Sequence, residues 1–169
     1  MKNKFLVTSL AAVSAVGVLF TASYEGFSHK PIIPVKGDVP TIGYGTTVYP
    51  NGEKVKMTDP AISKSFGMEL LKMHMTKEGK EFNKTLYGVK LSQKEYDLYM
   101  DFTYNFGIAN WKNSSMLRNL KQGKHVEACK SLLKWKYVAK RDCSIRSNGC
   151  YGVWIRQVDR YNLCMGENA

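Results

Sequence analysis

The sequence predicts an α+β fold, in which a small β-hairpin region precedes a mainly helical body. Residues 39–57 are rich in β-branched and aromatic side chains and contain the Asn51-Gly52 pair that favours a hairpin turn. From about residue 58 onward, apolar side chains recur every three or four positions instead. A block of strands followed by a block of helices is typical of α+β domains.

Five helices are expected after the hairpin region. The first begins near Thr58 or Asp59, either of which can serve as its N-cap. The second begins with a capping box formed by Ser92 and Glu95, and Gly107 suits its C-terminal end. Apolar spacing marks three more helices, around residues 116–120, 126–133 and 153–163.

The N-terminus has the pattern of a membrane-targeting segment. Two lysines precede residues 5–22, an uncharged run of eighteen residues. A helix of that length rises about 27 Å, which is marginally enough to span a bilayer core. Ala, Ser, Thr and Gly dilute the run, so we expect weak insertion, with the N-terminus on the cytoplasmic side. The predicted organisation is a signal-anchor segment over residues 1–23 and one catalytic domain over 24–169.

Cleavage and retention of this segment are both compatible with the sequence. Small residues near Ser23 fit a signal-peptidase site, and cleavage there would leave Glu25 as the second residue of the mature chain. A terminal residue is usually poorly ordered. If Glu25 is catalytic it needs a rigid helix before it, and this requirement favours retention.

The chain carries 25 Lys and Arg against 14 Asp and Glu, a formal net charge of +11. Such a surplus favours polyanionic partners such as nucleic acid, anionic lipid or an acidic wall polymer. The basic residues are scattered and form no nucleic-acid-binding motif, so a nucleic-acid partner is not expected. A solvated basic surface explains the charge equally well.

Four cysteines follow the export-like N-terminus, and their spacings match no usual zinc pattern. An even number of cysteines in an exported chain indicates disulfides, and four allow three pairings. We favour Cys143–Cys150, which closes a short polar loop, and Cys129–Cys164, which joins two helices. Free buried thiols are the alternative. No phosphate-binding loop, Rossmann glycine set or metalloprotease motif is present, so no cofactor and no metal are expected.

The candidate catalytic residues gather around the start of the hairpin region. Glu25 follows the apolar run, Asp38 precedes the Gly-rich TIGYGTT stretch, and Thr41 is the first residue of that stretch. A partly desolvated carboxyl can act as a general acid, and a second carboxylate can orient water or stabilise positive charge at a sugar carbon. Asp38 is alternatively a turn residue after a glycine. His29 would share a helix face with Glu25, but a surface histidine is the simpler interpretation.

Several segments together resemble the phage-lysozyme family, the endolysins of glycoside hydrolase family 24. YEGF and PTIGYGTT match its catalytic region, and DFTYNFG, SSMLRNLKQGKH and YGVWIRQVDRYNLC are similar to later family segments in the same order. The likeness covers residues 24–164. It implies a lysozyme-like fold and a muramidase that cleaves peptidoglycan between N-acetylmuramic acid and N-acetylglucosamine, causing host cell lysis.

The resemblance also implies roles for individual residues. Glu25 occupies the place of the general acid, and Thr41 that of the third catalytic residue. The family's aspartate falls on Pro34, nine positions after Glu25, so this chain departs from the pattern. Asp38 is the only carboxylate between Glu25 and Thr41, and we assign the role to it. Asn105 is implied to line the substrate cleft, although it could equally cap its helix.

The dilute apolar segment and its closeness to Glu25 resemble the signal-arrest-release subgroup of endolysins. That resemblance implies an inactive form held in the host inner membrane, followed by release into the periplasm and completion of the site. Peptidoglycan and, before release, the membrane are the expected partners, and the chain is expected to be a monomer. The alternative is a membrane-anchored wall-binding protein that lost catalysis with the displaced aspartate.

Overall fold

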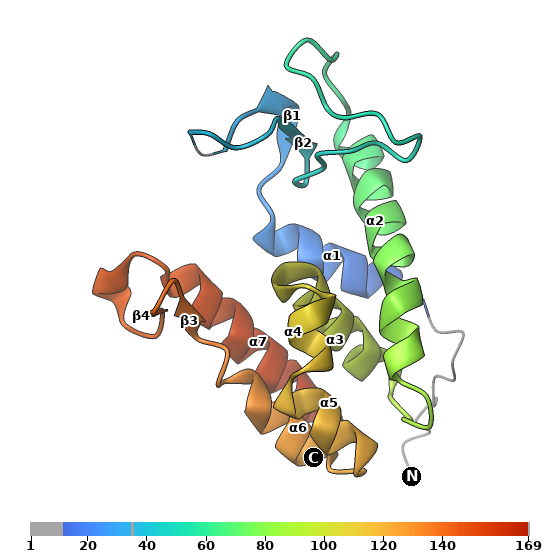
Figure 1. Ribbon diagram of the computed structural model, residues 1–169, viewed down its shortest axis with the longest axis vertical. Coiled ribbons are helices and arrows are strands. Elements are labelled where there is room, and N and C mark those ends of the chain that lie inside the picture. Colours follow the sequence, from blue (N-terminus) through green and yellow to red (C-terminus); the bar gives the residue numbers. More distant parts are fainter. Residues whose placement is uncertain (1–11, 35, 169) are drawn as a thin grey trace. The chain divides into compact units, whose positions relative to one another are not determined.

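The computed structural model describes residues 12–34 and 36–168, and these residues form two compact units (Figure 1). The N-terminal unit comprises Ala12–Glu81, and the C-terminal unit begins at Phe82. Helix α2, Lys64–Thr85, contributes residues to both units. The two units contain small antiparallel hairpins and otherwise mainly helices, so the predicted α+β class is confirmed.

The N-terminal unit is built from helix α1 (Ala15–Tyr24), strands β1 (Ser28–Ile32) and β2 (Thr41–Gly43), and most of α2. The two strands pair antiparallel, with Ser28 opposite Gly43 and Ile32 opposite Thr41. The register shifts between these pairs because β1 contributes more residues than β2. The sequence prediction missed β1, since its SHKPI sequence lacks alternation and contains a proline.

The predicted Asn51-Gly52 turn is confirmed, but the strands around it are shorter than expected. Gly52 has a φ of 88° and its N–H donates to the carbonyl oxygen of Tyr49 at 2.9 Å. Beyond β2, residues 44–57 pair only through two isolated bridges, Ile42 with Thr46 and Val48 with Lys54.

The predicted start of the helix that follows is wrong by several residues. Helix α2 begins at Lys64, where the Ser63 hydroxyl accepts a hydrogen bond from the Phe66 N–H at 3.1 Å. The preceding segment is not helical because the Ile62 N–H donates to the carbonyl oxygen of His29 in β1 at 2.8 Å. Tertiary pairing therefore determines where this helix begins.

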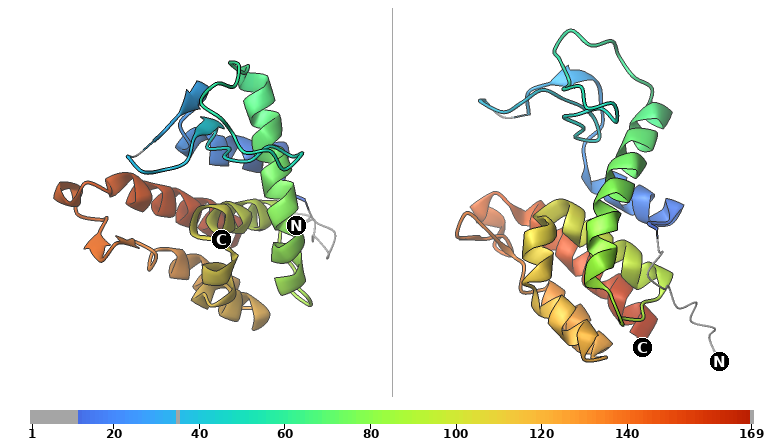
Figure 2. Two further views of the ribbon diagram at one scale, coloured as in Figure 1. Left: turned by 45° about the horizontal axis from the view of Figure 1, so that its top comes forward. Right: turned by 45° about the vertical axis from the view of Figure 1, so that its right-hand side comes forward.

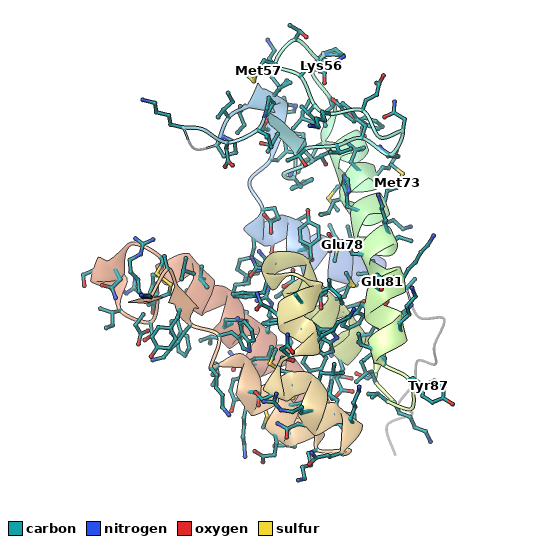
Figure 3. The ribbon with its side chains drawn as sticks, in the orientation of Figure 1. Lys56, Met57, Met73, Glu78, Glu81 and Tyr87 are labelled. Carbon is teal, nitrogen blue, oxygen red and sulfur yellow. A yellow bond between two sulfur atoms is a disulfide. The ribbon has the colours of Figure 1, made fainter. Side chains whose placement is uncertain are left out.

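Asp59, one of the two caps proposed from the sequence, closes a turn instead. Its Oδ2 accepts from the Lys56 N–H at 2.9 Å and from the Tyr49 hydroxyl at 3.1 Å. Figure 3 labels residues in the loop before α2 (Lys56, Met57), along α2 (Met73, Glu78, Glu81) and in the turn after it (Tyr87).

The C-terminal unit is mainly helical. Helices α3 and α6 both pack against α7, and α6 also packs against α5 (Figure 2). Its elements are α3 (Gln93–Phe106), α4 (Ile108–Lys112), α5 (Ser115–Lys121), α6 (His125–Leu132), β3 (Tyr137–Val138), β4 (Arg141–Asp142), a 3-10 turn (Arg146–Asn148) and α7 (Tyr151–Asn168). The expected helices around residues 116–120, 126–133 and 153–163 are confirmed, whereas α4 and the β3–β4 hairpin were not predicted.

The capping box predicted for α3 is confirmed. The Ser92 hydroxyl accepts from the Glu95 N–H at 3.1 Å, and the Glu95 carboxylate accepts from the Ser92 N–H at 2.9 Å. Gly107 ends the helix with a φ of 86°.

Aromatic side chains form the centre of the C-terminal unit. Trp111 is fully buried, and its ring centroid lies 5.0 Å from Phe82 and 5.3 Å from Tyr99. Its indole N–H donates to the Thr85 hydroxyl at 2.8 Å, so the one polar atom of this ring has a partner.

Two disulfides join the cysteines in the pairing that the sequence favoured. Cys129–Cys164 links α6 to α7, and Cys143–Cys150 closes the loop between β4 and α7.

The described part of the apolar N-terminal run is shorter as a helix than expected. Ser14 caps α1 by accepting from the Gly17 N–H at 3.1 Å, and residues 12–14 are not helical. Residues 1–11 of the predicted signal-anchor lie outside the described residues. Within residues 12–34 and 36–168, no helix has the combined length and apolarity needed to cross a membrane.

Candidate active site

Glu25 directly follows α1 and forms its C-terminal cap. Its backbone is extended, with φ −90° and ψ 126°, and its N–H donates to the carbonyl oxygen of Thr21 at 3.2 Å. Thr21 is fully buried, and its hydroxyl donates to the carbonyl oxygen of Gly17 at 3.2 Å. The half-buried Glu25 is therefore held by a helix of ordinary geometry, as a positioned acid requires.

An aromatic cluster fixes the chain just after Glu25. The Phe27 ring lies 5.1 Å from the ring of Tyr44 and 4.7 Å from that of His29. On the α2 side, a Cβ at Gly67 would approach the Phe27 ring to 2.7 Å, which is too close for any side chain unless the ring moves. Glycine at residue 67 thus lets Phe27 pack directly on α2, and the position of Glu25 is set from both sides.

His29 lies on β1 rather than on an extension of the helix, so the expectation of a face shared with Glu25 is wrong. Its Nδ1 lies 3.1 Å from the carbonyl oxygen of Ile62, and its ring contacts Phe27. These contacts make His29 a residue that joins the hairpin to the segment before α2, and its exposure agrees with the interpretation as a surface histidine.

Thr41 is the first residue of β2 and pairs with Ile32. Its hydroxyl donates a long hydrogen bond, 3.5 Å, to the Ile32 carbonyl oxygen. The hydroxyl oxygen keeps its lone pairs, so it can accept a hydrogen bond from a water molecule.

Asp38 lies in the loop between β1 and β2, immediately after a turn in which Gly37 has a φ of 93°. Its side chain is exposed, and among the described residues its carboxylate has no recorded hydrogen bond or ion pair. Pro34, at the position of the family aspartate, lies earlier in the same loop and is also exposed. Glu25, Asp38 and Thr41 all belong to the N-terminal unit.

Asn105 belongs to the C-terminal unit, near the end of α3. Its Oδ1 accepts from the Arg160 guanidinium at 3.3 Å. Arg160 is fully buried and forms a salt bridge with the buried Asp101 at 2.6 Å, and Arg156 does the same at 2.6 Å. Arg156, like Arg160, is therefore a buried structural ion-pair residue.

The sequence prediction missed the role of Arg160. The signal was the spacing of Arg156 and Arg160, which lie four residues apart on one helix face. Through Asp101 they join α7 to α3, and Arg160 also fixes the side chain of Asn105.

A helix that delivers an acid to the start of a small hairpin, in a chain that is otherwise mainly helical, defines a lysozyme-like protein. The family model for phage lysozyme matches residues 22–149. The chain therefore belongs to the phage lysozyme family. The predicted fold class and the predicted enzyme class, a glycoside hydrolase of lysozyme type that acts on peptidoglycan, are confirmed by this match.

Individual relatives agree with the family match. A stretch of 54 residues is 39% identical to a probable prophage lysozyme of Escherichia coli (strain K12), and covers 32% of this chain and 30% of that protein. A SAR-endolysin of bacteriophage PS119 is 28% identical over 131 residues, covering 75% of this chain and 74% of its own. The solved endolysin from Escherichia coli O157:H7 phage FAHEc1 has the same fold, with a TM-score of 0.76 at 23% identity and coverage of 94% and 96%.

Proposed function

We propose that this protein is an endolysin that hydrolyses the β-1,4 bond between N-acetylmuramic acid and N-acetylglucosamine, with Glu25 as the general acid. The observation that carries the proposal is the position of Glu25. This residue is the C-cap of α1, and the ring of Phe27, two residues later, packs against Tyr44. This arrangement holds one carboxyl group in a fixed place beside a hairpin that carries a second carboxylate and a hydroxyl.

In the proposed reaction the Glu25 carboxyl donates its proton to the glycosidic oxygen as the bond to the sugar carbon breaks. Positive charge then develops at that carbon and its ring oxygen. General acid catalysis of this kind contributes roughly 10²–10⁴-fold to the rate. The leaving sugar departs as a neutral alcohol. Water then adds to the sugar carbon as a hydroxyl group, and the proton that it loses restores the acid form of Glu25.

Asp38 and Thr41 are assigned to the other half of the reaction. The exposed Asp38 carboxylate would offset the positive charge or orient the water, and it has no recorded competing partner among the described residues. The Thr41 hydroxyl would accept a hydrogen bond from the same water. Asn105, oriented by Arg160, is assigned to substrate binding.

Digestion of purified sacculi tests the activity and identifies the bond. We expect the full-length chain to release fragments whose reducing end, after borohydride reduction and acid hydrolysis, is muramitol. Glucosaminitol in its place would indicate cleavage of the other glycosidic bond. Failure to generate reducing ends, together with retained binding to sacculi, would favour the alternative of a catalytically inactive wall-binding protein.

We also propose that residues 1–23 form a signal-anchor that holds the chain in the host inner membrane before release into the periplasm. The C-terminal part of this segment forms α1, and both its buried and its exposed face carry apolar side chains. Val16 and Leu19 are 72% and 59% exposed, and the buried residues are Gly17, Val18, Thr21 and Ala22. The buried side chains are mostly small, so docking of α1 covers little apolar area. A helix that is stabilised only weakly, both in the membrane and when docked on the folded protein, can transfer reversibly from one to the other.

Cell fractionation and N-terminal sequencing test the signal-anchor. We expect uncleaved protein in the membrane fraction at first and in the periplasmic fraction after the membrane potential is dissipated. Replacing Gly17 by Leu should strengthen insertion and delay release. A mature chain that begins near Tyr24 would contradict the proposal. Size-exclusion chromatography of the released protein should give a monomer.

A further inference from the structure

The C-terminal unit carries a hairpin whose turn is unusual. Strands β3 and β4 are joined by Ala139 and Lys140, with φ values of 46° and 66°. Two-residue turns with positive φ at both positions strongly favour Asn-Gly, because other side chains are strained there. In this chain a lysine occupies the position that glycine would fill with less strain, and its charge lies at the tip of the hairpin.

The hairpin and the loop after it, residues 134–151, are named here the basic hairpin. Several bonds fix its backbone. The Cys143–Cys150 disulfide closes the loop, and the Cys143 N–H donates to the carbonyl oxygen of Lys136 at 2.7 Å. The Asn148 side chain donates to the carbonyl oxygen of Asp142 at 2.8 Å. The side chains of this segment are thus presented on a cross-linked framework.

The charge of the basic hairpin is almost wholly positive. Asp142 is its only acid, and Lys136 already forms a salt bridge with it at 2.7 Å. Four further cations, Lys134, Lys140, Arg141 and Arg146, are exposed and form no ion pair among the described residues. The first turn of α7, which follows directly, contains no acidic residue, so the positive end of that helix adds to the field.

Two large apolar side chains are exposed beside these cations. Tyr137 is 56% and Ile145 51% exposed. Both lie next to Asp142, since Tyr137 pairs with it across the hairpin and the Ile145 N–H donates to its carbonyl oxygen at 3.2 Å. Aromatic and aliphatic side chains among lysines and arginines are typical of surfaces that insert shallowly into an anionic membrane interface.

We propose that the basic hairpin docks on the surface of membranes rich in anionic phospholipid. A hydrated wall polymer would recognise the cations, but it would not favour an exposed Ile145 on a rigid loop, whereas the headgroup boundary accommodates both. Docking is separate from the N-terminal signal-anchor and from cleavage of peptidoglycan. It would keep the chain close to the membrane after the signal-anchor has left the bilayer.

Vesicle sedimentation of the full chain tests the docking. One variant combines Lys140→Gln, Arg141→Gln and Arg146→Gln. Its matched control combines Lys112→Gln, Lys121→Gln and Lys124→Gln, which remove three exposed cations of the same unit outside the hairpin. On vesicles of phosphatidylglycerol and phosphatidylcholine at low salt, the hairpin variant should lose about tenfold or more in partitioning, and the control much less. Vesicles of phosphatidylcholine alone should show no difference between the two variants.

A second variant of the basic hairpin, with two substitutions, excludes misfolding as the cause. Lys140→Gln with Ile145→Ser changes two exposed side chains that form no hydrogen bond or ion pair among the described residues, and it should also weaken binding. Rates of sacculus cleavage should match those of the unaltered chain, so a failure of the enzyme and a failure of docking are distinguishable. Equal losses in the hairpin variant and its control would overturn the proposal. So would weaker sedimentation of the hairpin variant with sacculi but unchanged binding to vesicles, because the wall would then be the partner.

Discussion

The two units of the chain contrast in how their residues are held. The C-terminal unit contains both disulfides, the buried salt bridges of Asp101 and a cluster of aromatic rings around Trp111. The N-terminal unit carries Glu25, Asp38 and Thr41 on short strands, a loop and a helix end, and it contains no cysteine. Both disulfides and the buried ion pairs of Asp101 thus belong to one unit, and the proposed catalytic residues Glu25, Asp38 and Thr41 belong to the other. Substitutions in the C-terminal unit should therefore affect stability first, and substitutions of the catalytic residues should affect the rate first.

The largest loss of stability is expected from Asp101→Ala. This change leaves Arg156 and Arg160 buried without their carboxylate, and breaking a buried ion pair in this way costs about 4 kcal/mol. Chemical denaturation measures the free energy of unfolding. Glu127→Ala, which removes only an exposed pair with Lys130, should change it by about 0.5 kcal/mol or less. Equal effects of the two substitutions would contradict the structural role of the network.

The two disulfides should contribute unequally. Cys129 and Cys164 are 35 residues apart in sequence, and Cys143 and Cys150 are 7 apart. In the chain-entropy model, replacing the first pair by serine costs about 4 kcal/mol and replacing the second about 2.5 kcal/mol. Thermal unfolding of the two double variants should show this order. The reverse order would mean that native-state contacts of the hairpin loop dominate.

In the N-terminal unit, Asp38→Asn should reduce the rate of sacculus cleavage by about a hundredfold, because the group that orients water or offsets positive charge is lost. The side chain is exposed, so the free energy of unfolding should not change. Glu53→Gln provides the control, since Glu53 is another exposed acid of the same unit. An unchanged rate for Asp38→Asn would remove Asp38 from the site and leave Glu25 to act with a water held by Thr41.

The smallest effect expected is a pH dependence from His74 in α2. Its Nε2 is buried without a recorded hydrogen-bond partner among the described residues. Burial and, secondarily, the charge of Lys77 lower the pKa of His74, although a hydrogen bond with the Val48 backbone opposes the shift. The neutral ring is therefore favoured on folding. This contribution is fully present above the unfolded pKa of about 6.5 and is lost as the pH falls below it.

The melting temperature of the unaltered chain should therefore decrease as the pH is lowered from about 7 to about 5. The melting temperature of His74→Gln should decrease less over that range. Identical slopes for the unaltered chain and His74→Gln would show that other groups cause the acid sensitivity.

Local rules predicted much of the fold. The capping box of Ser92 and Glu95, the exit at Gly107 and the Cys143–Cys150 disulfide all depend on residues close in sequence. The start of α2 could not be predicted, because it depends on the pairing of Ile62 with His29, which lie 33 residues apart. The β3–β4 hairpin was missed because Ala139-Lys140 lacks the glycine that normally marks such a turn.

Of the candidate site, the place of Glu25 could be predicted from the sequence, but the packing around it could not. The place of Glu25 at a helix end followed from the apolar run before it, and the structure has it there. The packing of Phe27 on Gly67 could not be predicted from the sequence, because no local pattern relates Phe27 to a glycine forty positions later. The roles of Asp38, Thr41 and Asn105 stay predictions that only activity measurements can test.

The most direct test of the central claim is the initial rate of reducing-end release from purified sacculi by Glu25→Gln, compared with Glu53→Gln and with the unaltered chain. Glutamine keeps the shape of the side chain but cannot supply the proton. We expect a loss of about a thousandfold for Glu25→Gln, an unchanged rate for Glu53→Gln, and the same free energy of unfolding for all three. A Glu25→Gln protein that cleaves sacculi at the unaltered rate would contradict the account.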